Sequence, residues 1–296
     1  MDETSFTPLV RARVALEGLS VGDAFGERFF GEPREVSRRI RARELPPGPW
    51  RYTDDTEMAL SVVEELEAHG GIDQDALAER FARRLDPERG YGRGALMLLT
   101  FVRAGMNWRA VSKGSMGGEG SYGNGAAMRV APLGAWFADD LERAAAEARL
   151  SAEVTHAHPE GIAGAVGVAV AAALAWRGRG APLEAAGFLE QVAAAAPAGA
   201  TREGLEKARG LPAGIEVGAA AEALGNGAAV SAPDTVPFCV WMASRGLTYE
   251  ESLWRTASAS GDVDTTCAIV GGIVAAREGL DAVPRAWRLA RESLPK

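Results

Sequence analysis

The sequence predicts an all-α protein, and three observations support this fold class. Apolar residues recur with a helical period through most of the chain. Segments that combine strict apolar–polar alternation with β-branched residues are almost absent. Glycine accounts for 36 of the 296 residues, well above the usual share of about 7%. In a helical protein this excess belongs to loops and to close helix contacts such as Gly271-Gly272.

The helical pattern continues without a Pro/Ser linker or a charge block, so residues 1–296 are interpreted as one domain. The first helical segment, residues 9–21, closes in G-D-A-F-G at 22–26, whose glycines either end the helix or let another backbone come close. Asp73 is a candidate N-cap of a helix at 73–85. The other expected helices are one that starts at Thr53 and those at 95–102, 126–131, 141–155, 161–177, 183–195, 201–208, 235–243, 249–257, 267–276 and 282–293.

Residues 51–60, R-Y-T-D-D-T-E-M-A-L, gather polar groups at the start of a predicted helix. Thr53 is a competent N-cap, and acidic residues in the first turn, Asp54 and Asp55, suit the positive end of the helix dipole. Such a start can exist for stability alone. The pattern occurs a second time, however, because Asp262 and Asp264 crowd the entrance of the apolar segment 267–276.

If both helix starts face one cleft, four carboxylates and two or three threonine hydroxyls converge. Like charges about 4 Å apart repel by about 1 kcal/mol in water and several times more near a protein surface, so such a cluster needs cations. Two divalent ions would balance four carboxylates. The donor set is all oxygen, with no His or Cys at ligand spacing, and this favours a hard ion such as Mg²⁺, Mn²⁺ or Ca²⁺.

Residues 113–125, K-G-S-M-G-G-E-G-S-Y-G-N-G, are the least helical part of the chain. The glycines would let backbone N–H groups line an anion, while Tyr122 offers an aromatic face. A flexible surface loop has a similar composition, and the pattern matches neither the dinucleotide fingerprint nor the P-loop. We expect a helix to begin at 126, which would be a favourable place for phosphate oxygens. The glycine-spaced segment 89–94 also suits a connection that faces a ligand.

Charge and composition limit the classes of partner. The net charge of −8 argues against nucleic-acid binding and against an anionic membrane surface. Residues 1–7 are acidic and lack the regions of a signal peptide, so a cytoplasmic location is expected. The apolar run 161–176 is shorter than the roughly 20 residues that cross a bilayer, which predicts a central core helix. Cys239 and Cys267 lie in apolar surroundings and are expected to be core residues.

Taken together, the motifs resemble those of the ADP-ribosylglycohydrolase family. They occur in the order found in that family, from about residue 16 to residue 280: G-D-A-F-G at 22–26, Y-T-D-D-T at 52–56, R-G-Y-G at 89–92, G-S-Y-G-N-G-A-A-M-R at 120–129, T-H-A at 155–157 and G-D-V-D-T-T at 261–266. The resemblance implies a compact, roughly orthogonal all-α domain. It also implies a hydrolase that releases ADP-ribose by cleaving its glycosidic bond to a modified protein side chain or a small O-linked acceptor. The G-S-Y-G-N-G loop and the R-G-Y-G segment look more like the branch that acts on serine and related O-linked adducts.

The resemblance also implies which residues form the site. Two Mg²⁺ or Mn²⁺ ions would be held by Thr53, Asp54, Asp55, Asp262, Asp264 and Thr265. The diphosphate would lie at Gly120, Ser121, Tyr122, Gly123, Asn124 and Gly125, with Gly92 also in contact with the substrate. Tyr122 would lie near the adenine side, and His156 near the phosphates or the ribose. A histidine at the end of a helix also needs no function, because the helix dipole favours it there.

One departure from the family pattern concerns proton transfer. In many members a glutamate lies four residues after the last glycine of the G-D-x-x-G motif, and this position is Phe30 here. Glu27 or Glu32 is then a candidate for the catalytic acid or base, as are the aspartates at 54, 55 and 262. Glu27 and Glu32 can also be surface charges without a function.

Three alternatives to an ADP-ribosylglycohydrolase remain open from the sequence. The phenylalanine at position 30 leaves room for an ADP-ribose-binding protein with little turnover. A metal-dependent phosphohydrolase would split the diphosphate and yield AMP and ribose phosphate rather than intact ADP-ribose. A purely structural helical protein is disfavoured by the two separate acidic clusters. The sequence does not indicate the oligomeric state.

Overall fold

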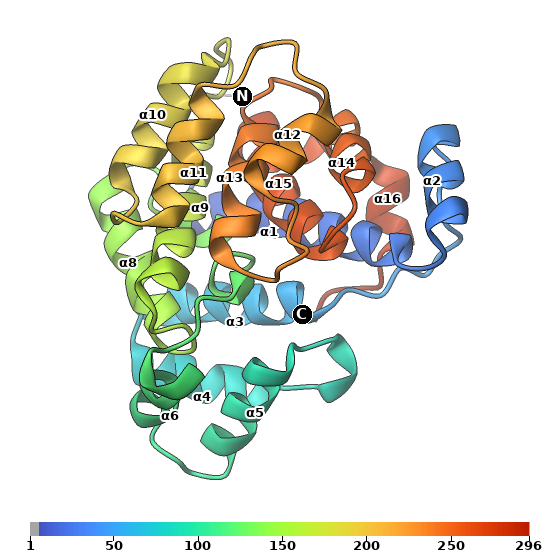
Figure 1. Ribbon diagram of the computed structural model, residues 1–296. Helices are drawn as coiled ribbons and strands as arrows, with labels where there is room; N and C mark the ends of the chain where they lie inside the picture. Colours follow the sequence, from blue (N-terminus) through green and yellow to red (C-terminus); the bar gives the residue numbers. More distant parts are fainter. Residues whose placement is uncertain (1–5, 296) are drawn as a thin grey trace.

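The computed structural model describes residues 6–295, and in this range the chain forms α-helices and short 3₁₀ turns without a β-strand (Figure 1). The predicted all-α fold class is therefore confirmed. Residues 1–5 of the acidic opening segment lie outside the described residues. The elements are α1 (Pro8–Gly26), η2 (Glu27–Phe29), α2 (Pro33–Ala42), α3 (Asp54–His69), α4 (Gln74–Arg84), η3 (Pro87–Arg89), α5 (Arg93–Arg103), α6 (Trp108–Gly114), η4 (Met116–Gly118), η5 (Asn124–Ala126), α7 (Ala131–Trp136), α8 (Leu141–Glu153), α9 (Pro159–Arg177), α10 (Ala185–Ala195), α11 (Ala200–Arg209), α12 (Val217–Leu224), α13 (Ala232–Ala243), α14 (Tyr249–Ser258), α15 (Val263–Glu278), η6 (Leu280–Ala282) and α16 (Arg285–Ala290).

The helices α1 and α15 pack against each other at the centre of the molecule. A Cβ atom built on Gly22 would lie only 2.2 Å from the carbonyl oxygen of Cys267. The glycines at 22–26 thus allow α15 to come close rather than ending the helix, because α1 continues through this segment. Gly26 in turn meets Val263. The C-terminal end of α1 therefore lies beside the N-terminal end of α15, where one of the acidic motifs is found.

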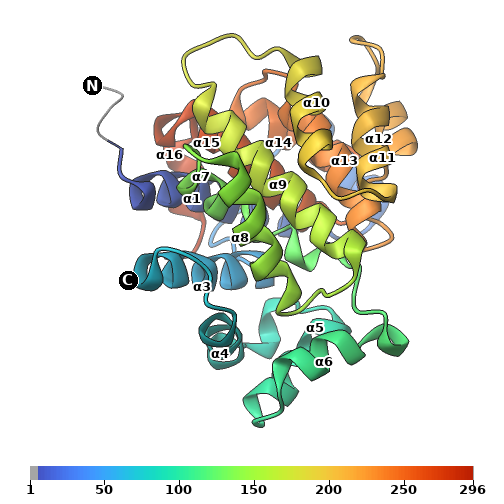
Figure 2. The same ribbon diagram turned by 90° about the vertical axis from the view of Figure 1, so that its left-hand side faces the viewer.

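The apolar run predicted as a central helix is α9, which lies beside α8 in Figure 2. By length and composition alone α9 would be able to cross a membrane, but 78% of its most apolar window is buried inside the fold. It packs against α7, α8, α13 and α15. The interpretation as a core helix agrees with this packing, and both cysteines are also free and buried in the core.

Several boundaries differ from the sequence prediction. The helices α2, α6 and α12 have no predicted counterpart. α2 presents only Val36 and Ile40 as partly buried apolar residues, a stripe too narrow to show in the periodicity, and α6 spans only seven residues. The predicted helix at 126–131 is wrong. The glycine-rich loop ends in the 3₁₀ turn η5, and the next helix, α7, begins only at Ala131, where Pro132 suits the first turn.

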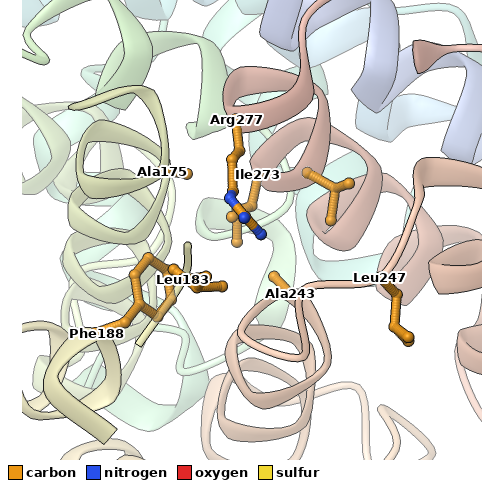
Figure 3. A pocket seen from close by; sticks show the side chains of 8 residues that line it. Ala175, Leu183, Phe188, Ala243, Leu247, Ile273 and Arg277 are labelled. Carbon is orange, nitrogen blue, oxygen red and sulfur yellow. The ribbon is translucent and has the colours of Figure 1, made fainter. Parts of the chain in front are cut away.

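A small apolar pocket between α9, α10, α13 and α15 is a packing feature of the core (Figure 3). Phe188, Ala243 and Ile273 line it together with Arg277, and no water molecule fits inside. It lies near the C-terminal end of α15. At a rise of about 1.5 Å per residue, this is roughly 15 Å from the acidic start of the same helix. The pocket is therefore separate from the candidate site.

Candidate active site

The N-terminus of α3 carries Thr53, Asp54 and Asp55 in the predicted helix start. Thr53 has an extended backbone and is the N-cap, and its Oγ1 accepts a hydrogen bond from the backbone N–H of Asp55 at 3.4 Å. Asp54 and Asp55 occupy the first turn, where the helix dipole favours negative charge. The predicted role of Thr53 as an N-cap is confirmed. Capping uses only the threonine hydroxyl, so both carboxylates remain available for a second role.

Asp23, from the core helix α1, is hydrogen-bonded to this helix start. Its carboxylate accepts hydrogen bonds from the backbone N–H groups of Thr53, at 3.0 and 3.1 Å, and of Thr56, at 3.1 Å. Both threonine hydroxyls also donate to it. Because both of its oxygens accept hydrogen bonds from the start of α3, Asp23 positions this turn. In the sequence Asp23 belongs to the G-D-A-F-G motif, but no role was predicted for it.

The N-terminus of α15 meets that of α3. Thr265 Oγ1 donates a hydrogen bond to Asp55 Oδ2 at 3.4 Å, across a sequence separation of 210 residues. One carboxylate oxygen each from Asp23, Asp55 and Asp264 lies within 4.8 Å of the others. The predicted convergence of the two acidic helix starts is confirmed.

The cluster contains two buried oxygen atoms that have no hydrogen-bond partner among the described residues, Oδ1 of Asp55 and Oδ1 of Asp264. Burial without a partner is costly for a carboxylate. Burial, together with the charges of neighbouring aspartates, raises the pKa of both carboxyls well above the usual range. An all-oxygen donor set with uncompensated negative charge fits hard divalent cations.

Asp23, already part of the cluster, and Asp54 add to its negative field. Burial raises the pKa of Asp23 to about 6, even though its hydrogen bonds act in the opposite direction. Burial also raises the pKa of Asp54 to about 7, with a further contribution from the charges of Asp23 and Asp262. The four predicted carboxylates, Asp54, Asp55, Asp262 and Asp264, thus lie close enough for their charges to act on one another, and of these Asp55 and Asp264 also lie at ligand spacing with Asp23.

Asp262 connects the acidic cluster with the glycine-rich loop. It is the N-cap residue of α15, and its Oδ2 accepts a hydrogen bond from Asn124 Nδ2 at 2.7 Å. Asn124 Nδ2 also lies 3.1 Å from Thr235 Oγ1 on α13. The loop and the metal-binding candidates are thus held at a fixed spacing by a buried amide.

The loop at 120–125 is held against the starts of α9 and α13. Gly120 has a φ of 79°, and a Cβ atom there would lie 2.6 Å from the backbone nitrogen of His158. The carbonyl oxygen of Tyr122 accepts a hydrogen bond from the N–H of Ala232 at 2.9 Å. Tyr122 is 43% exposed, and its ring meets the His158 ring edge-on at a centroid distance of 5.5 Å. Much of the tyrosine ring therefore remains accessible to a ligand.

His156 is buried beside this loop and is linked to the buried Arg129 through Thr155. Arg129 Nη1 donates to Thr155 Oγ1 at 2.9 Å, and Thr155 Oγ1 lies 2.7 Å from His156 Nδ1. The Nδ1 atom is thus engaged by the hydroxyl, and the other ring nitrogen, Nε2, faces the glycine-rich loop. Cβ atoms built on Gly123 and Gly125 would lie 3.2 and 3.0 Å from Nε2. Burial and the Arg129 charge lower the pKa of His156 to about 3, so it is a neutral imidazole beside the loop.

A pocket of about 360 Å³ adjoins Ser121 and His156, a volume within the range of roughly 300–1,000 Å³ that is usual for small-molecule sites. Most of its lining is apolar and comes from α5, α6 and the turns that follow them: Ala95, Met97, Leu98, Phe101, Met106, Val111 and Met116. Gly92, the N-cap residue of α5, has open space where a side chain would be. The loop thus borders an apolar groove of suitable size for a nucleoside.

The two glutamates that follow α1 lie in different surroundings. Glu27, in η2, is partly buried, and its charge contributes to the raised pKa of Asp264, which places it near the cluster. Burial raises the pKa of Glu27 itself. Glu32 is exposed and is the N-cap of α2, where it accepts a hydrogen bond from the N–H of Glu35 at 3.0 Å. Phe30 is 49% exposed. Of the two candidates, only Glu27 is placed beside the aspartates.

A family model described as ADP-ribosylglycohydrolase matches residues 5–294 of the sequence. The chain belongs to the ADP-ribosylglycohydrolase family. It is 31% identical to ADP-ribosylhydrolase ARH3 of Bos taurus, over 96% of this chain and 89% of the relative, and 30% identical to ADP-ribosylhydrolase ARH3 of Homo sapiens, over 96% and 90%. A solved structure titled "ADP-ribosylglycohydrolase-related protein complex" matches with a TM-score of 0.68 at 29% identity, covering 96% of this chain and 93% of that chain.

Membership confirms the resemblance and the enzyme class. This ADP-ribosylglycohydrolase is a glycosidase-type hydrolase that acts on ADP-ribosylated substrates, as the family does, and its acidic cluster is suited to the metal dependence of the family. The roles of individual residues stay predictions. These are the metal-binding roles of Thr53, Asp54, Asp55, Asp262, Asp264 and Thr265, the substrate-binding roles of Gly92, Gly120, Ser121, Tyr122, Gly123, Asn124, Gly125 and His156, and the catalytic roles of Glu27, Glu32 and the aspartates.

Proposed function

We propose that this enzyme releases ADP-ribose from O-linked acceptors, such as serine side chains and small O-linked groups, at a centre of two Mg²⁺ or Mn²⁺ ions. The observation that carries the proposal is the contact between the starts of α3 and α15, which leaves buried oxygens of Asp55 and Asp264 without partners. The glycine motifs and the similarity to the ARH3 relatives support the O-linked class of acceptor.

The metal ions would be held at the two helix starts by Thr53, Asp54, Asp55, Asp262, Asp264 and Thr265. Bound divalent ions would supply a grip on the ribose hydroxyls and a water of lowered pKa. Asp23 keeps the ligand spacing through its hydrogen bonds to Thr53 and Thr56. Asn124 holds the Asp262 carboxylate through the 2.7 Å hydrogen bond. The chain thus fixes the oxygen donors before any ion binds.

The diphosphate end of the substrate belongs at the glycine loop. Backbone N–H groups of residues 120–125 provide donors for phosphate oxygens. His156 is neutral because burial lowers its pKa to about 3, and in the tautomer with its proton on Nε2 it would add one more donor. Tyr122 and the apolar groove offer contact area for the adenine. In this proposal the loop binds and orients the substrate.

Cleavage at C1 of the ribose passes through an oxocarbenium-like state, so the leaving oxygen needs a proton and the attacking water must lose one. Our candidate for exchanging these protons is Glu27, because it lies near the cluster and burial raises its pKa. Glu32 already caps α2 and is exposed. A carboxylate beside the aspartates favours turnover over an ADP-ribose-binding protein, despite the phenylalanine at position 30.

The test is product analysis with a serine-ADP-ribosylated peptide. With Mg²⁺ or Mn²⁺ the enzyme should release intact ADP-ribose, excess EDTA should stop the release, and added metal should restore it. Tight binding without release would identify a binding protein. AMP and ribose phosphate would identify a phosphohydrolase, and either of these results would overturn the proposal.

A further inference from the structure

A second pocket adjoins the acidic cluster, and its lining contains none of the glycine-loop residues. It has a volume of about 350 Å³ and lies between the η2–α2 segment and the turn that precedes α15. Phe30 lines it from the η2–α2 segment. Ser260 and Gly261, directly before Asp262, line it from the turn that precedes α15. The remaining lining residues mix apolar and polar groups: Phe29, Gly31, Pro33, Val36, Ser37, Ile40, Arg41, Ala257, Ser258 and Val263.

The helix α2 gives this pocket a positive rim on a chain that is otherwise acidic. Four of its ten residues are arginines, whereas the whole chain has a net charge of −8. Arg38 is paired with Glu35 and Glu44. Arg34 and Arg41 are exposed and make no ion pair within residues 6–295, and Arg41 lines the pocket. α2 buries no residue fully and stands at the edge of the molecule beyond α14 and α16 in Figure 1.

The pocket lies where the geometry of the substrate requires the acceptor. If the ribose lies at the acidic cluster, as proposed above, its diphosphate extends toward residues 120–125. In a ribofuranose the C1 substituent and the C5 arm leave from opposite sides of the ring oxygen, so the acceptor extends away from the glycine loop. The glycine loop contacts the cluster through the hydrogen bond from Asn124 to Asp262. The η2–α2 segment approaches the cluster from Glu27, whose charge acts on Asp54 and Asp264.

We propose that this pocket and the two unpaired arginines bind the polypeptide that flanks the modified residue, and that they select acidic flanking sequences. The inference deepens the proposed function and rests on it. Arg34 and Arg41 complement carboxylates, the pocket serines supply hydroxyl groups, and the exposed ring of Phe30 supplies apolar contact. A peptide suits the site better than a nucleic acid, because the negative net charge of the chain repels a long polyanion.

The test compares two serine-ADP-ribosylated peptides that differ only in having glutamate or lysine beside the modified serine. The unmodified enzyme should release ADP-ribose from the glutamate peptide with a kcat/KM about tenfold higher, the scale of two or more exposed charge pairs. The variant R34E/R41E should lose or reverse this preference. The control R83E/R149E changes the net charge equally at two exposed arginines of α4 and α8 that make no ion pair in the described part of the chain, and it should keep the preference.

O-acetyl-ADP-ribose, which carries no polypeptide, separates this inference from the proposed function. The unmodified enzyme and the variants R34E/R41E and R83E/R149E should hydrolyse it at the same rate. Equal rates on the two peptides by the unmodified enzyme, or an equal effect of the control variant, would overturn the acidic-acceptor inference and leave the proposed function standing. RNA binding that R34E/R41E abolishes, without a peptide preference, would assign the arginines to another polyanion and overturn it too. No hydrolysis of any substrate would overturn both.

Discussion

The acidic cluster and the η2–α2 segment lie next to each other in space but are built in opposite ways. The cluster is formed where three core helices meet, and the carboxylate of Asp23 is held by hydrogen bonds from two threonines of α3. The helix α2 buries no residue fully, and its main ion pairs, from Arg38 to Glu35 and Glu44, are local. Under the two proposals above, the ribose chemistry would depend on buried core helices, whereas contact with the acceptor would depend on an exposed helix with few tertiary constraints.

The largest effect is expected within the cluster. Asp55→Asn should lower ADP-ribose release by about a thousandfold or more, the upper end of the loss from removing one preorganised electrostatic contact. The fold should persist, because an amide removes a buried charge whose Oδ1 has no partner in residues 6–295. Steady-state kinetics and circular dichroism check both points. The matched control is Asp73→Asn at the N-cap of α4, which should keep full activity. Similar losses in both variants would contradict the distinction between a ligand and a cap.

At the border between the two regions, Glu27→Gln should lower kcat by about a hundredfold, the usual scale of general acid–base catalysis. Glu32→Gln removes only the cap of α2 and should leave kcat unchanged. The two glutamates lie five positions apart in the chain, and both substitutions replace a carboxylate with an amide. Each variant is therefore the control for the other. Wild-type rates in both would exclude these glutamates as the proton-transfer group.

The link between the loop and the cluster should matter less than the ligands themselves. Asn124→Ala removes the hydrogen bond to Asp262, and we expect metal affinity to fall by about tenfold, the lower end for residues that orient ligands. Isothermal titration with Mn²⁺ measures this change. Asn107→Ala, which removes an asparagine cap at the start of α6, is the control and should leave the affinity unchanged.

The smallest effect concerns stability without metal. Asp23 and Asp54 have folded-state pKa values of about 6 and about 7, above the ordinary value of 3.8. Their protonated forms therefore contribute stability that is fully present below about pH 4 and is lost as the pH rises through these values. In EDTA, Tm should fall on the order of 5 °C between about pH 5 and pH 8, and Mg²⁺ should raise Tm more at the higher pH. Differential scanning fluorimetry measures the change. The variant Asp54→Asn should show a smaller fall of Tm with pH. A Tm that rises with pH in EDTA would contradict the explanation by deprotonation of buried aspartates.

The helices with a broad apolar face could be predicted from the sequence, as could the two acidic helix starts and their capping. The exposed helix α2 could not, because two apolar residues at one spacing do not establish a period. Asp23 and Arg129 received no role because their functions arise from contacts with residues 30 and 26 positions away, which local spacing does not reveal. The resemblance to a family made part of the site predictable, because it assigned motifs that are far apart in the chain to one site.

The central claim is that the starts of α3 and α15 share a pair of hard divalent cations. Anomalous diffraction from crystals grown with Mn²⁺ tests it most directly. The account predicts two peaks between the carboxylates of Asp54, Asp55, Asp262 and Asp264. The absence of any peak at these residues in an enzyme that turns over substrate with Mn²⁺ would contradict it.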